Sequence, residues 1–308
     1  MSQTPAALEG IGMTAFGVAM MRARESRRPD RLFDDPLASR FADFAFAAFN
    51  GPCAPADAES TWTTLERLVD AFYDTRVVAI RVFDDFLRDA SRHGCTQVVL
   101  VGAGLDTRAF RTIWAAPVTV YEVDTPAMHD FKAAVVADSA LAVAARIVVR
   151  ADLREDWAPA LLTAGYDPTL PTAWLIEGVL GYLPRADARR LLETATKHSA
   201  SRSRLAFEYT APTHAETTQT AGSIMQRARA VPGSQAYFST EEARGLGDDA
   251  REYLASLGWT NAYVDGHAAA LSYDRELPDE RTFGYLTCEL ERRQSWAERS
   301  SSSIRPSA

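Results

Sequence analysis

Hydrophobic positions follow one pattern in the first part of the chain and another in the rest. Up to about residue 92 they recur at helical spacing, as at Leu65, Leu68 and Phe72, which would share one helix face. Pro29 and Pro36 are expected to break the earlier helical stretch into pieces. The first 92 residues therefore predict a helical segment that precedes any strand.

From residue 97 short apolar runs alternate with helical stretches, which is typical of parallel strands buried on both faces. Strands are expected at residues 98–101, 119–123, 146–149, 173–176, 204–209, 259–264 and 283–290. Helices are expected to begin near Asp106, Pro126 and Pro184, and a last one spans 249–257. The pattern predicts an α/β fold with a largely parallel sheet.

These patterns divide the chain into five parts. The helical segment 1–92 contributes to a cap, and the sheet core spans 93–210. Residues 211–247 have few strand signals and are interpreted as a cap insertion, after which 248–292 complete the core. The tail 293–308 contains consecutive serines and little to bury, so we expect it to be disordered. One large domain with a cap, or two domains, fits this length.

Charge and cysteine content exclude several classes of function. The formal net charge is -8 and the pI about 5.3, which argues against a nucleic-acid ligand, because such binding depends on clustered Lys and Arg. Cys53, Cys95 and Cys288 lie far apart without a CxxC pair, so neither a disulfide framework nor a metal site is predicted. We expect a cytoplasmic protein with no export signal and no membrane span.

A glycine turn follows the first predicted strand. Gly102, Ala103 and Gly104 would let the backbone approach a ligand closely, although a tight turn without a ligand has the same pattern. Thr107 replaces the third glycine of the dinucleotide fingerprint, which disfavours a pyrophosphate ligand. Asp124 ends the next strand, 20 residues after Gly104, where a carboxylate can accept hydrogen bonds from both ribose hydroxyls of an adenosine.

Polar residues follow the third and fourth strands as well. Asp152 could accept from the adenine amino group while the Leu153 backbone faces the ring, or Asp152 could simply cap the following turn. Glu177, followed by Gly178, could neutralise a positive group of the ligand, or form a salt bridge to an arginine. Tyr182 could line an acceptor pocket, or serve only in packing.

With these blocks in this order, the chain resembles the bacterial branch of the leucine carboxyl methyltransferase family, from about Thr14 to Leu290. The carriers are the Arg-rich segment ending in Asp34-Asp35-Pro36, the turn 102–108, and the blocks 121–124, 152–157 and 177–183. The resemblance implies a class I, Rossmann-like, seven-stranded methyltransferase sheet that binds S-adenosylmethionine. It further implies that an arginine before the first strand holds the cofactor carboxylate: Arg76, with Arg81 as the alternative, and Arg24 as a second contact.

The class of methyl acceptor is inferred from the small number of residues that could act as a general base. A carboxylate is ionised at neutral pH and needs no general base, whereas a phenol needs one, and His214 is the candidate base that the sequence offers. We therefore predict methyl-ester formation on a small metabolite such as a polyketide-type acid. Arginines of the insertion (Arg227, Arg229, Arg244) could clamp an acidic acceptor or form a solvated helix face.

Three alternatives remain open at this stage. The chain could methylate a phenol or other hydroxyl in secondary metabolism, or bind the cofactor without turnover. An NAD-dependent oxidoreductase is disfavoured by Thr107 and by the absence of a Tyr-xxx-Lys pair. The expected partner is a small-molecule acceptor, and the expected assembly is a monomer or homodimer.

Overall fold

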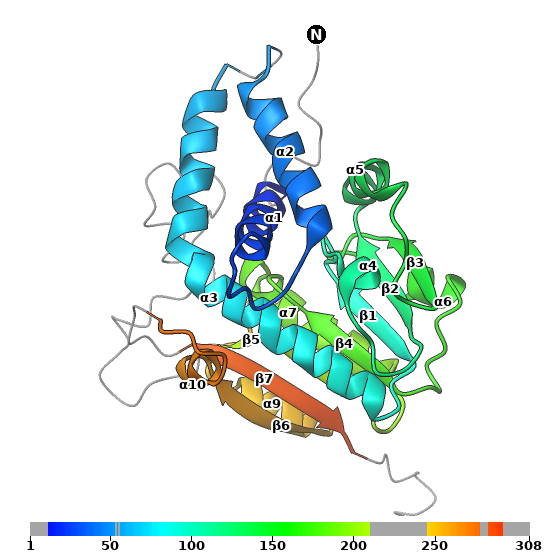
Figure 1. The fold of residues 1–308 in the computed structure, drawn as a ribbon. Coiled ribbons are helices and arrows are strands. Elements are labelled where there is room, and N and C mark those ends of the chain that lie inside the picture. The colour runs from blue at the N-terminus through cyan, green and yellow to red at the C-terminus, as the bar shows by residue number, and fades with distance from the viewer. Residues whose placement is uncertain (1–11, 53, 55, 210–244, 278–282, 292–308) are drawn as a thin grey trace, which may run out of the picture.

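A computed structural model describes residues 12–52, 54, 56–209, 245–277 and 283–291. The described part begins with the helices α1 (Gly12–Ser26), α2 (Pro36–Asn50) and α3 (Ala58–Arg92). They pack around Phe16, Phe41 and Leu65, which are almost fully buried. Figure 1 shows α2 and the first half of α3 rising beyond the sheet, while the second half of α3 crosses it.

The break between α1 and α2 falls where the two prolines predict it. Helix α1 ends before Pro29, and Pro36 occupies the first turn of α2, where its missing N–H costs no hydrogen bond. Asp35 caps α2, because its side chain accepts the N–H of Ala38 at 3.1 Å. The Asp-Pro pair thus fixes the point at which the second helix starts.

Seven strands form one sheet in the order β3-β2-β1-β4-β5-β7-β6. They are β1 (Gln97–Val101), β2 (Thr119–Asp124), β3 (Ala145–Arg150), β4 (Thr172–Ile176), β5 (Arg204–Tyr209), β6 (Trp259–Asp265) and β7 (Gly284–Leu290). The first five are parallel, and β7 is antiparallel to both β5 and β6. The predicted α/β fold with a seven-stranded Rossmann-like sheet is confirmed, and each predicted strand matches to within one residue at either end.

Helices cover both faces of this sheet. On one face, residues of α3 and α10 (Gly266–Ser272) belong to one apolar cluster with Val98 and Leu100 of β1, and α10 itself lies against α3, β6 and β7. On the other, α6 (Ala158–Thr163), α7 (Arg185–Lys197) and α9 (Ala250–Ser256) contribute to the cluster that contains Trp174 of β4. Residues of β1 alternate between the two clusters, which explains why this strand is apolar throughout. Helix α5 (Pro126–Val136) joins the apolar cluster of α1 and α2.

Several short helices differ from the sequence prediction, and among them α6 was not predicted. The helix expected near Asp106 is α4 (Arg108–Arg111), which is only four residues long. It begins after Asp106, whose carboxylate accepts the N–H of Arg108 at 2.6 Å. Helix α10 was not predicted. Most of the expected insertion, and the expected disordered tail, lie outside the described residues. No helix in the described ranges has both the length and the apolar character needed to cross a membrane.

Candidate functional site

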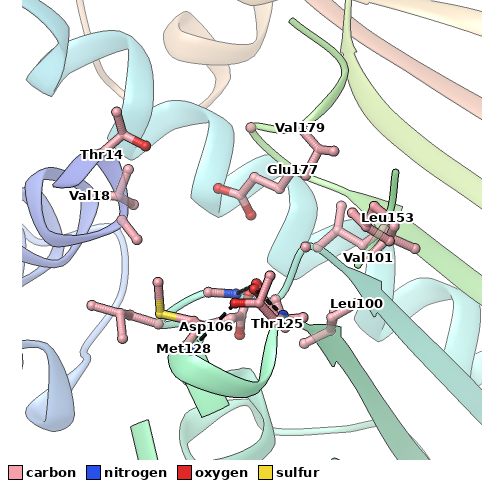
Figure 2. A pocket seen from close by; sticks show the side chains of 18 of the residues that line it. Thr14, Val18, Leu100, Val101, Asp106, Thr125, Met128, Leu153, Glu177 and Val179 are labelled. Atoms are coloured by element: carbon pink, nitrogen blue, oxygen red, sulfur yellow. Dashed lines mark hydrogen bonds between the residues drawn. The ribbon is translucent and has the colours of Figure 1, made fainter. Parts of the chain in front are cut away.

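A cavity of about 450 Å³ lies at the carboxyl ends of β1, β2 and β4. The strand order reverses between β1 and β4, and open α/β sheets bind their ligands at such a reversal. Figure 2 shows Thr14 and Val18 of α1 facing Glu177 and Val179, which follow β4, across this cavity. The N-terminal helices therefore supply one wall and the sheet edge supplies the other.

Most of the predicted site residues line this cavity: Arg76, Gly102, Ala103, Gly104, Asp124, Asp152, Leu153, Glu177, Gly178 and Tyr182. Arg24 and Arg81 do not. Arg24 reaches Asp70 at 2.9 Å and stacks on Tyr73, because it projects from the outer side of α1. Arg81 binds Asp85 and the Leu32 carbonyl. His214 and the three arginines of the insertion lie outside the described residues.

The glycine turn has the geometry that the sequence predicts. Gly102 and Gly104 have φ values of +67° and +45°, in the left-handed region that favours glycine. A Cβ on Gly102 would lie 2.5 Å from Val179 Cγ2, so a larger residue would collide with the loop that follows β4. The turn thus keeps the backbone open toward the cavity, which suits close contact with a cofactor.

Asp124 lies at the edge of the glycine turn. Its Oδ2 accepts the Gly104 N–H at 2.7 Å, and its Oδ1 accepts the Thr125 N–H at 2.7 Å. Each carboxylate oxygen can accept more than one hydrogen bond, so both retain capacity for ligand hydroxyls. The neighbouring acid, Glu122, is instead fully buried between Lys132 and Arg146, away from the cavity. The preference for Asp124 over Glu122 therefore agrees with the geometry.

Asp152 contacts the cavity and also organises its own turn. It accepts the backbone N–H of Arg154 at 2.9 Å and pairs with the Arg154 side chain. Turn capping and ligand contact, weighed as alternatives from the sequence, are thus geometrically compatible. The pKa of Asp152 is lowered, first by the hydrogen bond from Arg154, so a carboxylate acceptor is present at neutral pH.

A network of ion pairs lies beneath the cavity. Arg108, almost fully buried, binds Asp84 at 2.6 Å, Asp106 at 2.5 Å and Glu177 at 2.7 Å. Burial is the largest single influence on the Asp106 carboxyl and raises its pKa. Arg108, together with Lys132, Arg22 and Arg111, outweighs burial and lowers this pKa to about 2. The salt bridge considered for Glu177 is therefore present, and its main partner is Arg108.

Thr107 joins this network to the N-terminal helices. Its hydroxyl donates to Asp35 at 2.6 Å and accepts from Arg22 at 3.3 Å and Arg111 at 3.2 Å. Arg111 in turn pairs with Asp84. The residue that departs from the dinucleotide fingerprint thus has a structural role of its own, which holds the α1–α2 link against the glycine turn.

Among the buried arginines around the cavity, Arg76 has donors to spare. Its contacts with described residues use Nη1 alone, at 2.5 Å from Glu208 and 3.7 Å from Glu177. In Arg108 and Arg111, by contrast, all three guanidinium nitrogens donate hydrogen bonds, to carboxylates, to Thr107 or to a backbone carbonyl. Nε and Nη2 of Arg76 are therefore available for an anionic ligand group, which fits the carboxylate of a methionine moiety.

The charge of the cluster suits a ligand that also carries positive charge. Its members are Arg22, Arg76, Arg108 and Arg111 on one side and Asp35, Asp84, Asp106, Glu177 and Glu208 on the other. One carboxylate thus lacks a matching guanidinium. Burial raises the pKa of Glu177, with Arg108 opposing this rise. A sulfonium or ammonium group near Glu177 would supply the missing charge.

Tyr182 lines the cavity beside the α1 wall. Burial raises its pKa, which a hydrogen bond with Thr14 of α1 partly opposes, so Tyr182 is a neutral phenol at neutral pH. No histidine among the described residues lines the cavity: His129, for example, is buried against the Val149 carbonyl. The described walls therefore provide hydrogen bonding and packing to an acceptor without an imidazole base.

The sequence interpretation missed several residues of the site. Arg22, Asp106, Arg108 and Arg111 line the cavity, and Glu208 lies directly behind Arg76. A signal for Arg22 was present, since Thr14, Val18 and Arg22 follow one another at intervals of four and so share a helix face. The partners of Arg108 lie as far apart as Asp84 and Glu177, and no spacing rule connects them.

The fold and the position of this cavity are Rossmann-like. Two solved structures share the fold: a methyltransferase-type protein from Thermobifida fusca (17% identity, TM-score 0.50, covering 80% of this chain and 93% of that one) and a protein of a domain family of unknown function from Streptomyces avermitilis (17% identity, TM-score 0.53, covering 80% and 95%). At this identity the likeness concerns the fold alone.

The sequence profile of the leucine carboxyl methyltransferase family matches residues 15–196, and the chain belongs to this family. A Streptomyces coelicolor protein is 41% identical over 87% of this chain and 89% of its own length, and a Parafrankia protein is 39% identical over 88% and 84%. The names of both relatives give S-adenosyl-L-methionine-dependent methyl transfer as their expected activity. The predictions of this family, of a methyltransferase and of S-adenosylmethionine as its cofactor are confirmed.

Proposed function

We propose that this methyltransferase transfers the methyl group of S-adenosylmethionine to a carboxylate oxygen of a small acceptor. The observation that carries the proposal is the combination of free donors on Arg76, a carboxylate at Asp124, and a described cavity wall without an imidazole base. The first two features concern the cofactor. The third concerns the acceptor.

The adenosine end of the cofactor is assigned to the ends of β2 and β3. Asp124 accepts hydrogen bonds from the ribose hydroxyls, and Asp152 accepts from the adenine amino group beside the Leu153 backbone. The glycine turn lets the cofactor lie against the backbone between Gly102 and Gly104. These contacts select an adenosine and fix its orientation relative to the sheet.

The methionine end is assigned to the loop after β4 and to α3. Arg76 donates Nε and Nη2 to the cofactor carboxylate, while Glu177 faces its positive groups. Gly178 has a φ of +66° and so lets the loop turn immediately after Glu177. Arg22, two residues before the predicted Arg24, takes the place expected for a second arginine of α1, because it is the one that lines the cavity.

S-adenosylmethionine, when bound, supplies an electrophilic methyl group on a sulfonium. The protein's work is then to align the acceptor oxygen behind that methyl group and to exclude water. Tyr182 lines the cavity together with the α1 residues Thr14 and Val18, and Figure 2 shows Thr14 and Val18 on the side opposite Glu177. This wall positions the acceptor by packing and by hydrogen bonding.

A carboxylate acceptor suits these surroundings. It is already ionised at neutral pH and gives up no proton during transfer, so it needs none of the bases that the described wall lacks. Tyr182 cannot serve as that base in its neutral form, since its pKa is raised by burial. The family to which the chain belongs is itself named for carboxyl methylation, which supports the same acceptor class.

The proposal is tested with methyl-labelled S-adenosylmethionine and a panel of small carboxylic acids, phenols and amines. We expect label to enter carboxylic acids and to be released as methanol on mild alkaline treatment, because methyl esters hydrolyse under those conditions. Methyl ethers of phenols and methylamines keep their label in the same treatment. Transfer to phenols or amines alone would show that the acceptor class is wrong.

A further inference from the structure

Glu208 lies behind the cavity wall and connects two of its parts. It is near the carboxyl end of β5, and its side chain is 15% exposed. Its Oε1 accepts from Arg76 Nη1 at 2.5 Å, and its two oxygens lie 3.2 and 2.9 Å from the Gly178 nitrogen, which donates to them. Glu208 is not one of the residues that line the cavity, so it acts through Arg76 and Gly178.

Glu208 and Glu177 compete for the same nitrogen of Arg76. Nη1 lies 2.5 Å from Glu208 but 3.7 Å from Glu177, so Glu208 holds the closer contact. Without that contact, Arg76 would be drawn toward Glu177, because an unpaired buried guanidinium moves to the nearest carboxylate. A tight pair between Arg76 and Glu177 would occupy the two groups that face the methionine end of the cofactor.

The backbone contact has a second effect. Gly178 adopts a φ of +66°, and its N–H would have no partner in the turn if Glu208 did not accept it. The same carboxylate thus fixes the loop that carries Glu177 and the guanidinium opposite it. Both groups are set at the correct separation before any cofactor binds, which reduces the cost of ordering them on binding.

We propose that Glu208 is a positioning residue for the methionine end of S-adenosylmethionine, keeping Arg76 and Glu177 apart. This inference rests on the proposed function, in which Arg76 binds the cofactor carboxylate. Since the adenosine end lies on β2 and β3, Glu208 governs only one end of the ligand. Changes at Glu208 are therefore expected to leave the affinity for a ligand without the amino-acid part unchanged.

The test compares the full cofactor with 5′-methylthioadenosine, which keeps the adenosine and the sulfur but lacks the amino and carboxylate groups. Both are titrated calorimetrically into the wild-type chain and into Glu208→Gln, whose amide oxygen can still accept from Gly178. We expect Glu208→Gln to lower the affinity for S-adenosylmethionine by about tenfold or more and the affinity for methylthioadenosine by less than about twofold. Glu289→Gln, on β7 beside the half-buried Arg204, is the matched control and should change neither.

A double-variant cycle shows whether Glu208 acts through Arg76. In an Arg76→Met background, Glu208→Gln should cause little further loss of S-adenosylmethionine affinity, because its partner is already missing. If Glu208→Gln does not fold, as judged by thermal melting, Glu208→Asp takes its place, since it keeps the charge but moves it by one methylene. The same selective loss, smaller in size, is then expected.

Two results would overturn the inference alone: unchanged S-adenosylmethionine affinity in the Glu208 variants, or an equal loss for both ligands, which would indicate general damage to the site. If the wild-type chain bound methylthioadenosine and S-adenosylmethionine equally well, Arg76 would not hold a carboxylate, and both this inference and the assignment of the methionine end would fail. If it bound neither, the proposed function itself would be wrong.

Discussion

In the proposed function, Asp124 combines a structural and a ligand-binding task in one side chain. Its two oxygens each accept one backbone N–H, from Gly104 and Thr125, and both remain directed at the cavity. The carboxylate therefore fixes the shape of the glycine turn and presents the acceptors that a ribose needs. Few substitutions preserve both, since an amide offers only one acceptor oxygen.

We expect Asp124→Asn to lower the affinities for S-adenosylmethionine and 5′-methylthioadenosine by about tenfold or more, because the ribose is common to the two ligands. Calorimetric titration measures both affinities. Asp130→Asn removes an exposed carboxylate that pairs with Arg150 and should leave them unchanged. If Asp124→Asn bound both ligands as tightly as the wild-type chain, Asp124 would not contact the cofactor.

At the same scale, we expect Glu177 to make cofactor binding depend on pH. Its pKa is raised by burial, so the carboxylate that attracts the cofactor's positive groups becomes populated only at a higher pH than for an ordinary glutamate. We expect the dissociation constant for S-adenosylmethionine to fall as the pH rises from about 5 to 7, a range below the titration of the cofactor's amino group.

The pH dependence is measured by calorimetry at several pH values, with Glu177→Gln as the comparison. The variant should bind more weakly at pH 7 and lose the dependence, because the neutral amide does not titrate. Glu289→Gln should keep the dependence of the wild-type chain. An identical pH profile in Glu177→Gln would assign the titration to another group.

At the scale of elements, Thr107 joins the α1–α2 link to the glycine turn. Its hydroxyl contacts Asp35, Arg22 and Arg111, and Asp35 also caps α2. A single side chain thus connects the start of α2, the inner face of α1 and the beginning of α4. The wall of the cavity that α1 provides depends on this connection.

We expect Thr107→Val, which keeps the shape of the side chain, to lower the free energy of unfolding by about 1–3 kcal/mol, because Asp35 loses a donor in a fully buried setting. Urea-induced unfolding measures the change. Thr169→Val removes an exposed hydroxyl that contacts only its neighbour Asp167 and should cost less than about 0.5 kcal/mol. Equal losses in the two variants would argue against a special role for Thr107.

The elements that could be predicted from the sequence are those whose pattern is long or strongly apolar. The strand 97–101 is buried on both faces, so its run of apolar residues is unambiguous. Helix α10 spans only Gly266–Ser272 and, unlike the equally short α9, which Gly258 follows, it has no glycine after its last turn to mark its end. Its cap, Asp265 accepting from Ala268, is apparent only once the backbone is folded.

The same limit applies to the site. Strand ends and glycine turns can be located from spacing, which is why Asp124 and Gly102 were found. Arg22 and Arg24 differ by two positions on α1, about 200° around the helix, so only one of them can face the cavity. Which one does is decided by packing against Asp35 and Thr107, and those partners come from other elements.

At the scale of the whole molecule, the cavity is formed by two parts of the chain that are far apart in sequence. The N-terminal helices provide Thr14, Val18 and Arg76, and the sheet edge provides the glycine turn and the loop after β4. Ligand binding therefore has to stabilise the contact between these parts. The distal edge of the sheet, at β6, takes no part in the cavity.

We expect S-adenosylhomocysteine to slow hydrogen exchange in α1, in the glycine turn and in residues 177–183, and to leave β6 unchanged, because only the former gain contacts. Exchange followed by mass spectrometry with and without ligand measures this difference. Uniform slowing across the sheet would indicate global stabilisation only. Unchanged exchange in α1 would show that the helix is not part of the binding site.

The measurement that tests the central claim most directly is a calorimetric titration of the full-length chain with S-adenosylmethionine and, separately, with NAD. The account predicts saturable binding of one S-adenosylmethionine per chain, with an affinity about tenfold or more lower in Asp124→Asn and in Arg76→Met, and no binding of NAD. Binding of NAD in preference to S-adenosylmethionine, or full S-adenosylmethionine affinity in both variants, would contradict it.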